Sequence, residues 1–301
     1  MTPNEQLEIT GNFRLPATTG IIMSGADRFI HNFGLENFFA GVNTGNLTMT
    51  GFGNVGVGEA ALSSNTTGFG NTDTGISALE ANTMGVHNTA TGESSLEGNT
   101  TGGENTATGS LALQSNTTGN NNTATGHSAM ARNTTGVNNT AVGRDAMLFN
   151  TTGVSNTAIG SAALSDNTNG KANTANGQAA RSNNTTGEEN TAAGFLALFF
   201  NTIGFANTAT GSNNTAIGHN ADVSQGDLTN FTAIGANAIV DVSNKIQLGD
   251  DNVTEVQING YTKLDLTSGA PPAADYDEVS DRGRMKVNNV AGSLYICIDS
   301  G

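Results

Sequence analysis

The chain has 301 residues, including 40 Gly, 13 Phe and no Trp, and only 12% of its residues are charged. Large side chains are therefore too scarce for the thick core of an ordinary globular domain of this length. The net charge of −15 disfavours binding to nucleic-acid phosphates or anionic lipid head groups, and no apolar run is long enough for membrane insertion.

The N-terminal segment, residues 1–53, is predicted to be a cap or attachment segment. It holds much of the bulky apolar content, and the alternation at residues 7–9 (Leu-Glu-Ile) and 13–15 (Phe-Arg-Leu) is typical of short strands. It precedes a long array of repeats, whose first strand edge would otherwise stay unpaired. The first residues lack the basic start and apolar run of a secretory signal.

Residues 54–240 repeat a unit of seventeen residues. The unit reads Asn-Thr-Ala-x-Gly, x-x-Ala-Leu, two variable residues, Asn-Thr-Thr-Gly and two more variable residues. A first glycine series runs from 58 to 211 in steps of 17, and a second runs from 68 to 204. Such constant spacing predicts coils stacked on one another, because an insertion would misalign every later side chain. We predict an all-β fold, a β-solenoid (β-roll) with small β end modules, because disordered low-complexity chains keep no phase.

One column of the repeat, four residues after the first glycine, is almost entirely Leu or Met. It is predicted to face the interior as a core ladder of Leu62, Leu79, Leu96, Leu113, Met130, Met147, Leu164 and Leu198. Two further columns are mostly Ala, which implies close approach of another backbone. Each unit is expected to supply two strands of about four to five residues, with glycine at the corners between them.

Asn also recurs in two columns. The first consists of Asn71, Asn88, Asn105, Asn122, Asn139, Asn156, Asn173, Asn190 and Asn207. Amides in register can bond to their neighbours above and below, as Asn ladders do in stacked strands. We expect these side chains to hold the corners of the coils.

Beyond residue 211 the register slips, because the next Asn-Thr-Ala-Ile-Gly motif, at 214–218, arrives early. Residues 241–267 alternate polar and apolar side chains and are predicted to form a β neck whose strands leave the repeat. A Pro-containing linker then leads into residues 268–301, for which we predict a small C-terminal β module.

The thin core predicts that chains associate. One Leu and a few Ala per coil bury little area, and at ~25 cal/mol per Å2 this scarcely offsets ordering seventeen residues at about 1 to 2 kcal/mol each. Packing one apolar face against two partner chains supplies the missing burial, so we expect a homotrimer. Whether copies also join end to end into a filament stays open.

The motif Thr-Ala-Ile-Gly at 157–160, 215–218 and 232–235 resembles the Ser-Val-Ala-Ile-Gly signature of YadA-like trimeric adhesin heads, over residues 54–240. Segments 244–249, 283–287 and 293–298 look like the distal region of phage-type tail-fibre proteins. The resemblance implies three β-rolls around a threefold axis and a structural attachment function. It also implies an extracellular place, on a virion, an injection device or a cell surface, and a cell-surface glycan or protein receptor.

No set of residues predicts a catalytic, cofactor or metal site, and we expect no enzyme activity. His31, His87, His127 and His219 stand in different coils at no metal-ligand spacing. The acidic groups at 250–251 and 275–278 lack the regular spacing of a calcium loop and are better explained as turns. The glycines of residues 51–56 match a dinucleotide-binding pattern, but no helix can follow them because the repeats begin at once.

Candidate receptor contacts are bulky groups at variable positions, namely Phe149, Phe199, Phe200 and Phe205. Packing between trimer subunits is an equally good explanation for them. Two other functions stay open. An ice-binding solenoid would use the Thr column that includes Thr66, Thr100 and Thr117, although a Thr-Thr pair gives only one outward column. A polysaccharide-cleaving spike would need paired carboxylates in a cleft, and nothing in the sequence marks a cleft.

Overall fold

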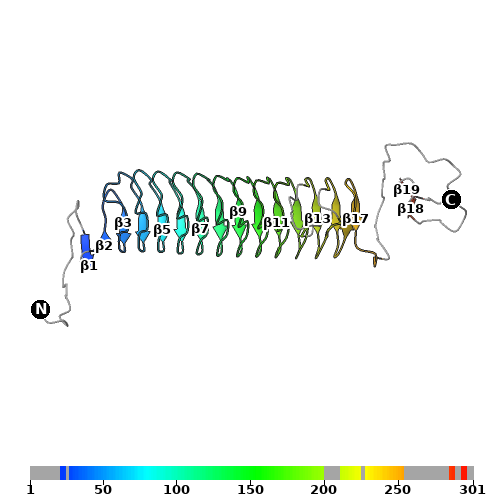
Figure 1. The fold of residues 1–301 in the computed structure, drawn as a ribbon, viewed down its shortest axis with the longest axis horizontal. Helices are drawn as coiled ribbons and strands as arrows, with labels where there is room; N and C mark the ends of the chain where they lie inside the picture. Colours follow the sequence, from blue (N-terminus) through cyan, green and yellow to red (C-terminus); the bar gives the residue numbers. More distant parts are fainter. Residues whose placement is uncertain are drawn as a thin grey trace, which may run out of the picture. The chain divides into compact units, whose positions relative to one another are not determined.

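The computed structural model describes residues 21–24, 27–199, 211–224, 228–253, 285–288 and 293–296. The chain divides into two compact units, residues 1–254 and 255–301. The first unit contains a β-solenoid, so the predicted all-β solenoid of 17-residue repeats is confirmed (Figure 1). In the second unit, β18 (Met285–Asn288) and β19 (Ser293–Ile296) form an antiparallel hairpin. Within these described ranges there is no helix that could span a membrane.

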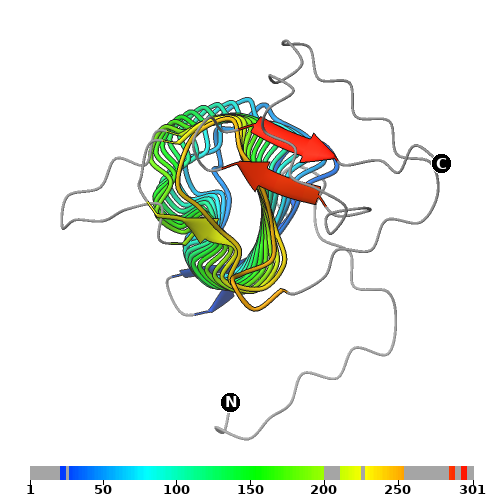
Figure 2. The ribbon, with the colours of Figure 1, turned by 90° about the vertical axis from the view of Figure 1, so that its right-hand side faces the viewer.

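One parallel sheet runs the length of the solenoid, with one short strand from each coil. Its strands are β3 (Phe38–Ala40), β4 (Val55–Val57), β5 (Thr72–Thr74), β6 (Thr89–Thr91), β7 (Thr106–Thr108), β8 (Thr123–Thr125), β9 (Thr140–Val142), β10 (Thr157–Ile159), β11 (Thr174–Asn176), β12 (Thr191–Ala193), β13 (Thr215–Ile217), β15 (Thr232–Ile234) and β17 (Ile246–Leu248). Equivalent residues pair without offset, as Thr89 does with Thr106. Seen end on, the coils therefore superimpose (Figure 2).

From residue 55 to residue 199 each coil has one strand, of three residues, and the predicted second strand is absent. The Leu and Ala columns lie instead in a turn, where Leu96 and Leu113 both have φ of 52°. A strand needs negative φ throughout, so a left-handed residue at every Leu position excludes one. The turns still bond from coil to coil, as when the Leu96 N–H donates to the Ala112 carbonyl at 3.0 Å.

The core is a narrow column between the sheet and these turns. All eight Leu and Met side chains of the core ladder are fully buried, and so are the Ala residues at the centre of strands β6 to β13. The small Ala side chains leave room for the bulkier Leu and Met column opposite. The core therefore takes one large and a few small apolar side chains from each coil.

Both glycine series lie where coils approach one another most closely. A Cβ on Gly92, whose φ is 130°, would lie 2.6 Å from the carbonyl carbon of Gly109 in the next coil. A Cβ on Gly102 would lie 2.4 Å from the Gly119 carbonyl oxygen. Any side chain at these positions would push neighbouring coils apart, which explains why glycine recurs every seventeen residues.

At the N-terminal end, β1 (Ile21–Ser24) and β2 (Asp27–His31) form an antiparallel pair. Strand β2 also pairs antiparallel with β3, on the side of β3 away from β4. It therefore occupies the edge at which the parallel sheet begins. Residues 1–20 of the predicted cap lie outside the described residues.

Near the C-terminal end of the solenoid, the register of the repeats changes in a way that differs from the prediction. Strand β12 pairs with β13 through Thr191 and Thr215, which are 24 residues apart. Gly211 was predicted to belong to the first glycine series, but its carbonyl accepts from Asn190 Nδ2 at 2.9 Å, as carbonyls of the second series do. A second strand per coil appears here, where β14 (Asp222–Val223) pairs with β16 (Ile239–Val240).

The predicted neck, residues 241–267, does not begin by leaving the repeat. Its first strand, β17, pairs in parallel with β15 and so extends the solenoid sheet. The alternation of Ile246, Gln247 and Leu248 fits this position, because the middle residue of each strand turns inward. Residues 254–267 lie outside the part of the chain that the structure describes.

Candidate interaction surfaces

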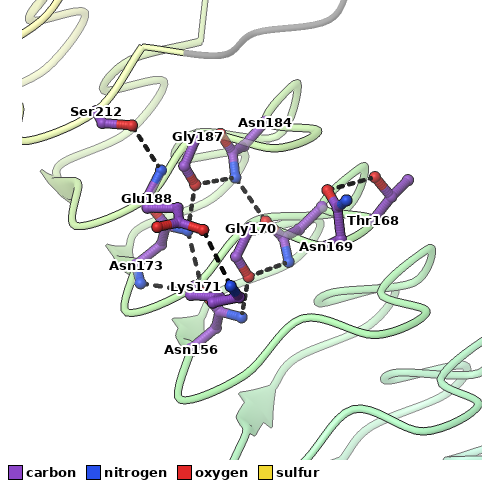
Figure 3. Close-up of polar contacts among 11 residues, drawn as sticks. Asn156, Thr168, Asn169, Gly170, Lys171, Asn173, Asn184, Gly187, Glu188 and Ser212 are labelled. Carbon is purple, nitrogen blue, oxygen red and sulfur yellow. Dashed lines mark hydrogen bonds and ion pairs between the residues drawn. The ribbon is translucent and has the colours of Figure 1, made fainter.

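The predicted Asn ladder is a buried column of hydrogen bonds. Asn173 Nδ2 donates to Asn156 Oδ1 at 3.1 Å and to the Gly187 carbonyl at 2.7 Å (Figure 3). The same pattern holds from Asn71 to Asn173, and each of these side chains is fully buried. Asn207 lies outside the described residues. Because the amides are satisfied internally, this ladder holds coils together and offers nothing to a ligand.

Three buried ionisable groups interrupt the apolar columns, and the sequence analysis assigned none of them a role. Asp73 takes the place of Ala at the centre of β5, and burial raises its pKa well above the usual value. Arg181 and Asp222 both stand in the Leu column, on either side of Leu198. Burial lowers the pKa of Arg181 to about 9, against the opposing effect of the Asp222 charge. The signal that reveals them is a charged residue in an otherwise apolar column.

The two predicted receptor contacts that the structure describes, Phe149 and Phe199, lie in different coils. The half-buried ring of Phe149 lies beneath the guanidinium of Arg132, 4.7 Å from its Cζ to the ring centroid. Phe199, three coils further on, is also half-buried, and its carbonyl accepts from Asn183 Nδ2 at 2.8 Å. Phe200 and Phe205 lie outside the described residues. Of the four, Phe149 therefore provides the one bulky contact position whose surroundings are fully described.

An open groove of about 450 Å3 lies on the same corner of the coils as Phe149, nearer the N-terminus. It is lined by Ser64, Glu80, Ala81, Glu97, Gly98, Gln114 and Ser115. Ala81 and Gly98 leave empty the space that Phe149 fills in its own coil. Gln114 Nε2 donates to Glu97 Oε2 at 2.9 Å, so the wall of the groove is a carboxylate–amide pair. The sequence did not mark this cleft because it depends on small residues at variable positions.

The outward face of the long sheet carries no charge. The first and third residues of each strand from β4 to β13, and of β15 and β17, point away from the core, and none of them is Asp, Glu, Lys or Arg. The third position changes along the sheet, from Thr in β5 to β8 to mostly Val or Ile afterwards. In a chain of net charge −15, this is a distinct uncharged surface.

The Thr column that was proposed to bind ice is not an outward array of free hydroxyls. Thr100 Oγ1 donates to the Thr117 carbonyl at 3.0 Å, and Thr117 Oγ1 donates to the Thr134 carbonyl at 2.9 Å. Thr66 makes the equivalent bond to the Thr83 carbonyl. These hydroxyls form hydrogen bonds between neighbouring coils, so their function is structural.

Among the described residues no three His, Cys, Asp or Glu side chains are grouped as metal ligands. Asp250 accepts hydrogen bonds from the Asn252 backbone N–H and side-chain amide, both at 3.0 Å, and the side-chain bond lowers its pKa. This arrangement is an Asx turn. The acidic residues at 275–278 lie outside the described part of the chain.

A scan against models of known protein families finds no match to the chain, and a search of curated proteins finds no similar sequence.

Proposed function

We propose that this chain is a structural fibre and attachment protein, similar in function to a tail fibre or adhesin, and that it acts outside the cell that makes it. The solenoid supports this proposal because its coils are joined on every side by hydrogen bonds. The strand ladder, the Leu turns and the Thr and Asn columns all connect neighbouring coils. Such a body resists bending and suits a spacer that holds a binding surface away from its support.

The proposal rests above all on the uncharged sheet face and its apolar stripe. The apolar stripe consists of the outward third-position residues Val142, Ile159, Ile217, Ile234 and Leu248, which are 38% to 45% exposed. Their strands follow one another at about 4.8 Å, with Asn176 and Ala193 at the intervening third positions. An apolar row of this kind, which Asn176 interrupts, is typical of a surface that another chain covers. We propose that three copies associate here, each burying its stripe against the other two.

Receptor recognition then falls to the corners, where the sequence varies from coil to coil. The groove beside Glu97 and the Arg132–Phe149 pair share one corner, outside the sheet face. Carboxylate, amide and aromatic groups bind both sugar hydroxyls and protein side chains, so a cell-surface glycan or a protein is the proposed receptor.

The experiment that tests this function is the mass of the purified protein in solution, measured by light scattering coupled to size exclusion. We expect the mass of three chains. A single-chain mass would contradict the association that the proposal requires. Binding of the labelled trimer to a printed glycan array, compared with a Phe149→Ser variant, then tests the corner as the receptor site.

A further inference from the structure

The N-terminal half of the sheet face differs from the half that carries the apolar stripe. Strands β5 to β8 present Thr at both outward positions, so two Thr columns stand side by side. We call this surface the Thr array; its members are Thr72, Thr74, Thr89, Thr91, Thr106, Thr108, Thr123 and Thr125. All eight side chains are exposed. The strands thus carry a Thr-x-Thr spacing, which gives two outward Thr columns where a Thr-Thr pair gives only one.

The hydroxyls of the Thr array are free to bind a partner. Within the described ranges, none of the eight donates or accepts a side-chain hydrogen bond, whereas Thr117, on another side of the same coil, donates to the next coil. The two kinds of Thr therefore serve different purposes. The Thr117 column stabilises the stack, and the Thr array leaves its hydroxyl and methyl groups facing solvent.

The geometry of the array is fixed in two directions. Along a strand, outward residues such as Thr106 and Thr108 are about 6.6 Å apart, and across strands the coils repeat at about 4.8 Å. Pairing without offset, as between Thr108 and Thr125, keeps the columns straight. Asp73, the one acidic residue within these four strands, is buried and points away from the array. The surface is therefore a regular, uncharged lattice of alternating hydroxyl and methyl groups.

We propose that the Thr array binds the surface of crystalline water. A partner that matches every Thr at once must itself repeat in two directions, and ice does so while offering a hydrogen-bonding group at each repeat. Methyl groups between the hydroxyls order the adjacent water instead of competing for its hydrogen bonds. A crystalline polysaccharide also repeats in two directions, but it is recognised by stacking on aromatic rings, and the array contains none.

This activity uses other residues than the proposed association of copies, but it uses the same face of the sheet. The apolar stripe begins at Val142 in β9, the strand that follows the array. Packing of three copies along the stripe would also cover the array, so ice binding is measured on the Ile159→Lys/Ile234→Lys protein, in which the stripe can no longer associate.

The test is thermal hysteresis and the shape of ice crystals in solutions of the full chain. We expect measurable hysteresis and faceted crystals for the Ile159→Lys/Ile234→Lys protein, whose array no other copy covers, and loss of both when Thr106→Tyr is added, because it places a bulky ring in the middle of the array. Thr118→Tyr, at an exposed position of the same coil but outside the sheet, should keep the full effect. A Thr106→Ser/Thr108→Ser variant removes two methyl groups without adding bulk and should lower the hysteresis while the fold is retained.

Absence of hysteresis in the Ile159→Lys/Ile234→Lys protein would overturn the proposal. Equal losses in Thr106→Tyr and Thr118→Tyr would overturn it as well, as would binding to insoluble cellulose that Thr106→Tyr abolishes. The light-scattering mass of each variant separates this result from the proposed function. A separated chain without hysteresis ends the ice proposal alone, and a single-chain mass for the unaltered protein ends the trimer proposal alone.

Discussion

The guanidinium of Arg181 bonds to the last described member of the second Asn column, which runs from Asn65 to Asn184, because its Nη2 donates to Asn184 Oδ1 at 2.7 Å. Earlier in that column the donor is the Asn of the following coil, as when Asn167 Nδ2 donates to Asn150 Oδ1 at 2.7 Å. The same Nη2 also donates to the Gly211 carbonyl at 2.9 Å, across the lengthened coil. Arg181 therefore joins two coils where the regular repeat is interrupted.

Replacing Arg181 by Leu, the residue of the consensus, should destabilise the protein. The change restores the Leu column but leaves Asn184 Oδ1 without its donor and the buried Asp222 carboxylate without a nearby positive charge. Leaving a buried acceptor without its donor typically costs about 1 to 3 kcal/mol. We expect a loss of this size in the free energy of unfolding, measured by urea denaturation.

The matched control is Met147→Leu in the same column, which should cost less than about 1.5 kcal/mol. An Arg181→Leu/Asp222→Leu double variant should be more stable than Arg181→Leu alone, because it removes both charges. If the double variant is no more stable than the single one, the two charges do not interact and the reasoning fails.

Asp73→Ala should stabilise the protein and remove part of its pH dependence. Burial raises the pKa of Asp73 in the folded chain, so the folded state holds a proton that the unfolded state releases above about pH 4. Stability from this group is complete below the unfolded-state pKa and falls as pH rises toward the folded-state pKa. Denaturation midpoints at pH 4 and pH 7 should therefore differ less in Asp73→Ala than in the unaltered protein.

Asp251→Ala, at an exposed position, provides the control for a general change in charge. It should leave the difference between the two midpoints unchanged. A pH dependence that is the same in Asp73→Ala and the unaltered protein would show that this carboxyl does not titrate over the range.

Much of the fold follows from the sequence because the constraint is periodic. The spacing of Gly92 and Gly102 from their equivalents predicts the coil length, and the Leu96 column predicts the interior. The missing second strand could not be predicted, because the left-handed φ of Leu96 comes from packing between coils and contradicts the usual preference of Leu.

The candidate surfaces were harder to predict, for a different physical reason. Whether the Thr66 column or the Thr89 column is free to bind a ligand depends on which hydroxyls donate to backbone carbonyls of the next coil. The sequence does not give the positions of those carbonyls. The groove beside Glu97 arises from small residues in successive coils. The exchange of Gly211 from one glycine series to the other depends on where the coil accommodates its extra residues.

The Asn ladder should be intolerant of change at its centre. Asn122 Nδ2 donates to Asn105 Oδ1 and to the Gly136 carbonyl, and its Oδ1 accepts from the backbone and side chain of Asn139. Asn122→Ala leaves buried partners unsatisfied, at about 1 to 3 kcal/mol each. Asn122→Asp should cost at least as much, because a carboxylate oxygen would then face two other acceptors, Asn105 Oδ1 and the Gly136 carbonyl.

Urea denaturation measures both losses, and Asn176→Thr is the control. Asn176 is exposed on the sheet face, and Thr occupies the equivalent position in β5 to β8. Its replacement should change the unfolding free energy by no more than about 0.5 kcal/mol. A loss in Asn122→Ala as small as in Asn176→Thr would mean that the ladder bonds merely replace bonds to water.

The apolar stripe leads to the last prediction, on self-association. Ile159→Lys/Ile234→Lys places two charges on a face where each would meet its equivalents in the other copies, so we expect the light-scattering mass to fall from three chains to one. Ile76→Lys, 53% exposed at a corner outside the sheet, should leave the trimer intact. Because all three residues are exposed in the single chain, the fold itself should tolerate each change. A trimer that survives the double change, or dissociates equally with Ile76→Lys, would place the contact elsewhere on the coils.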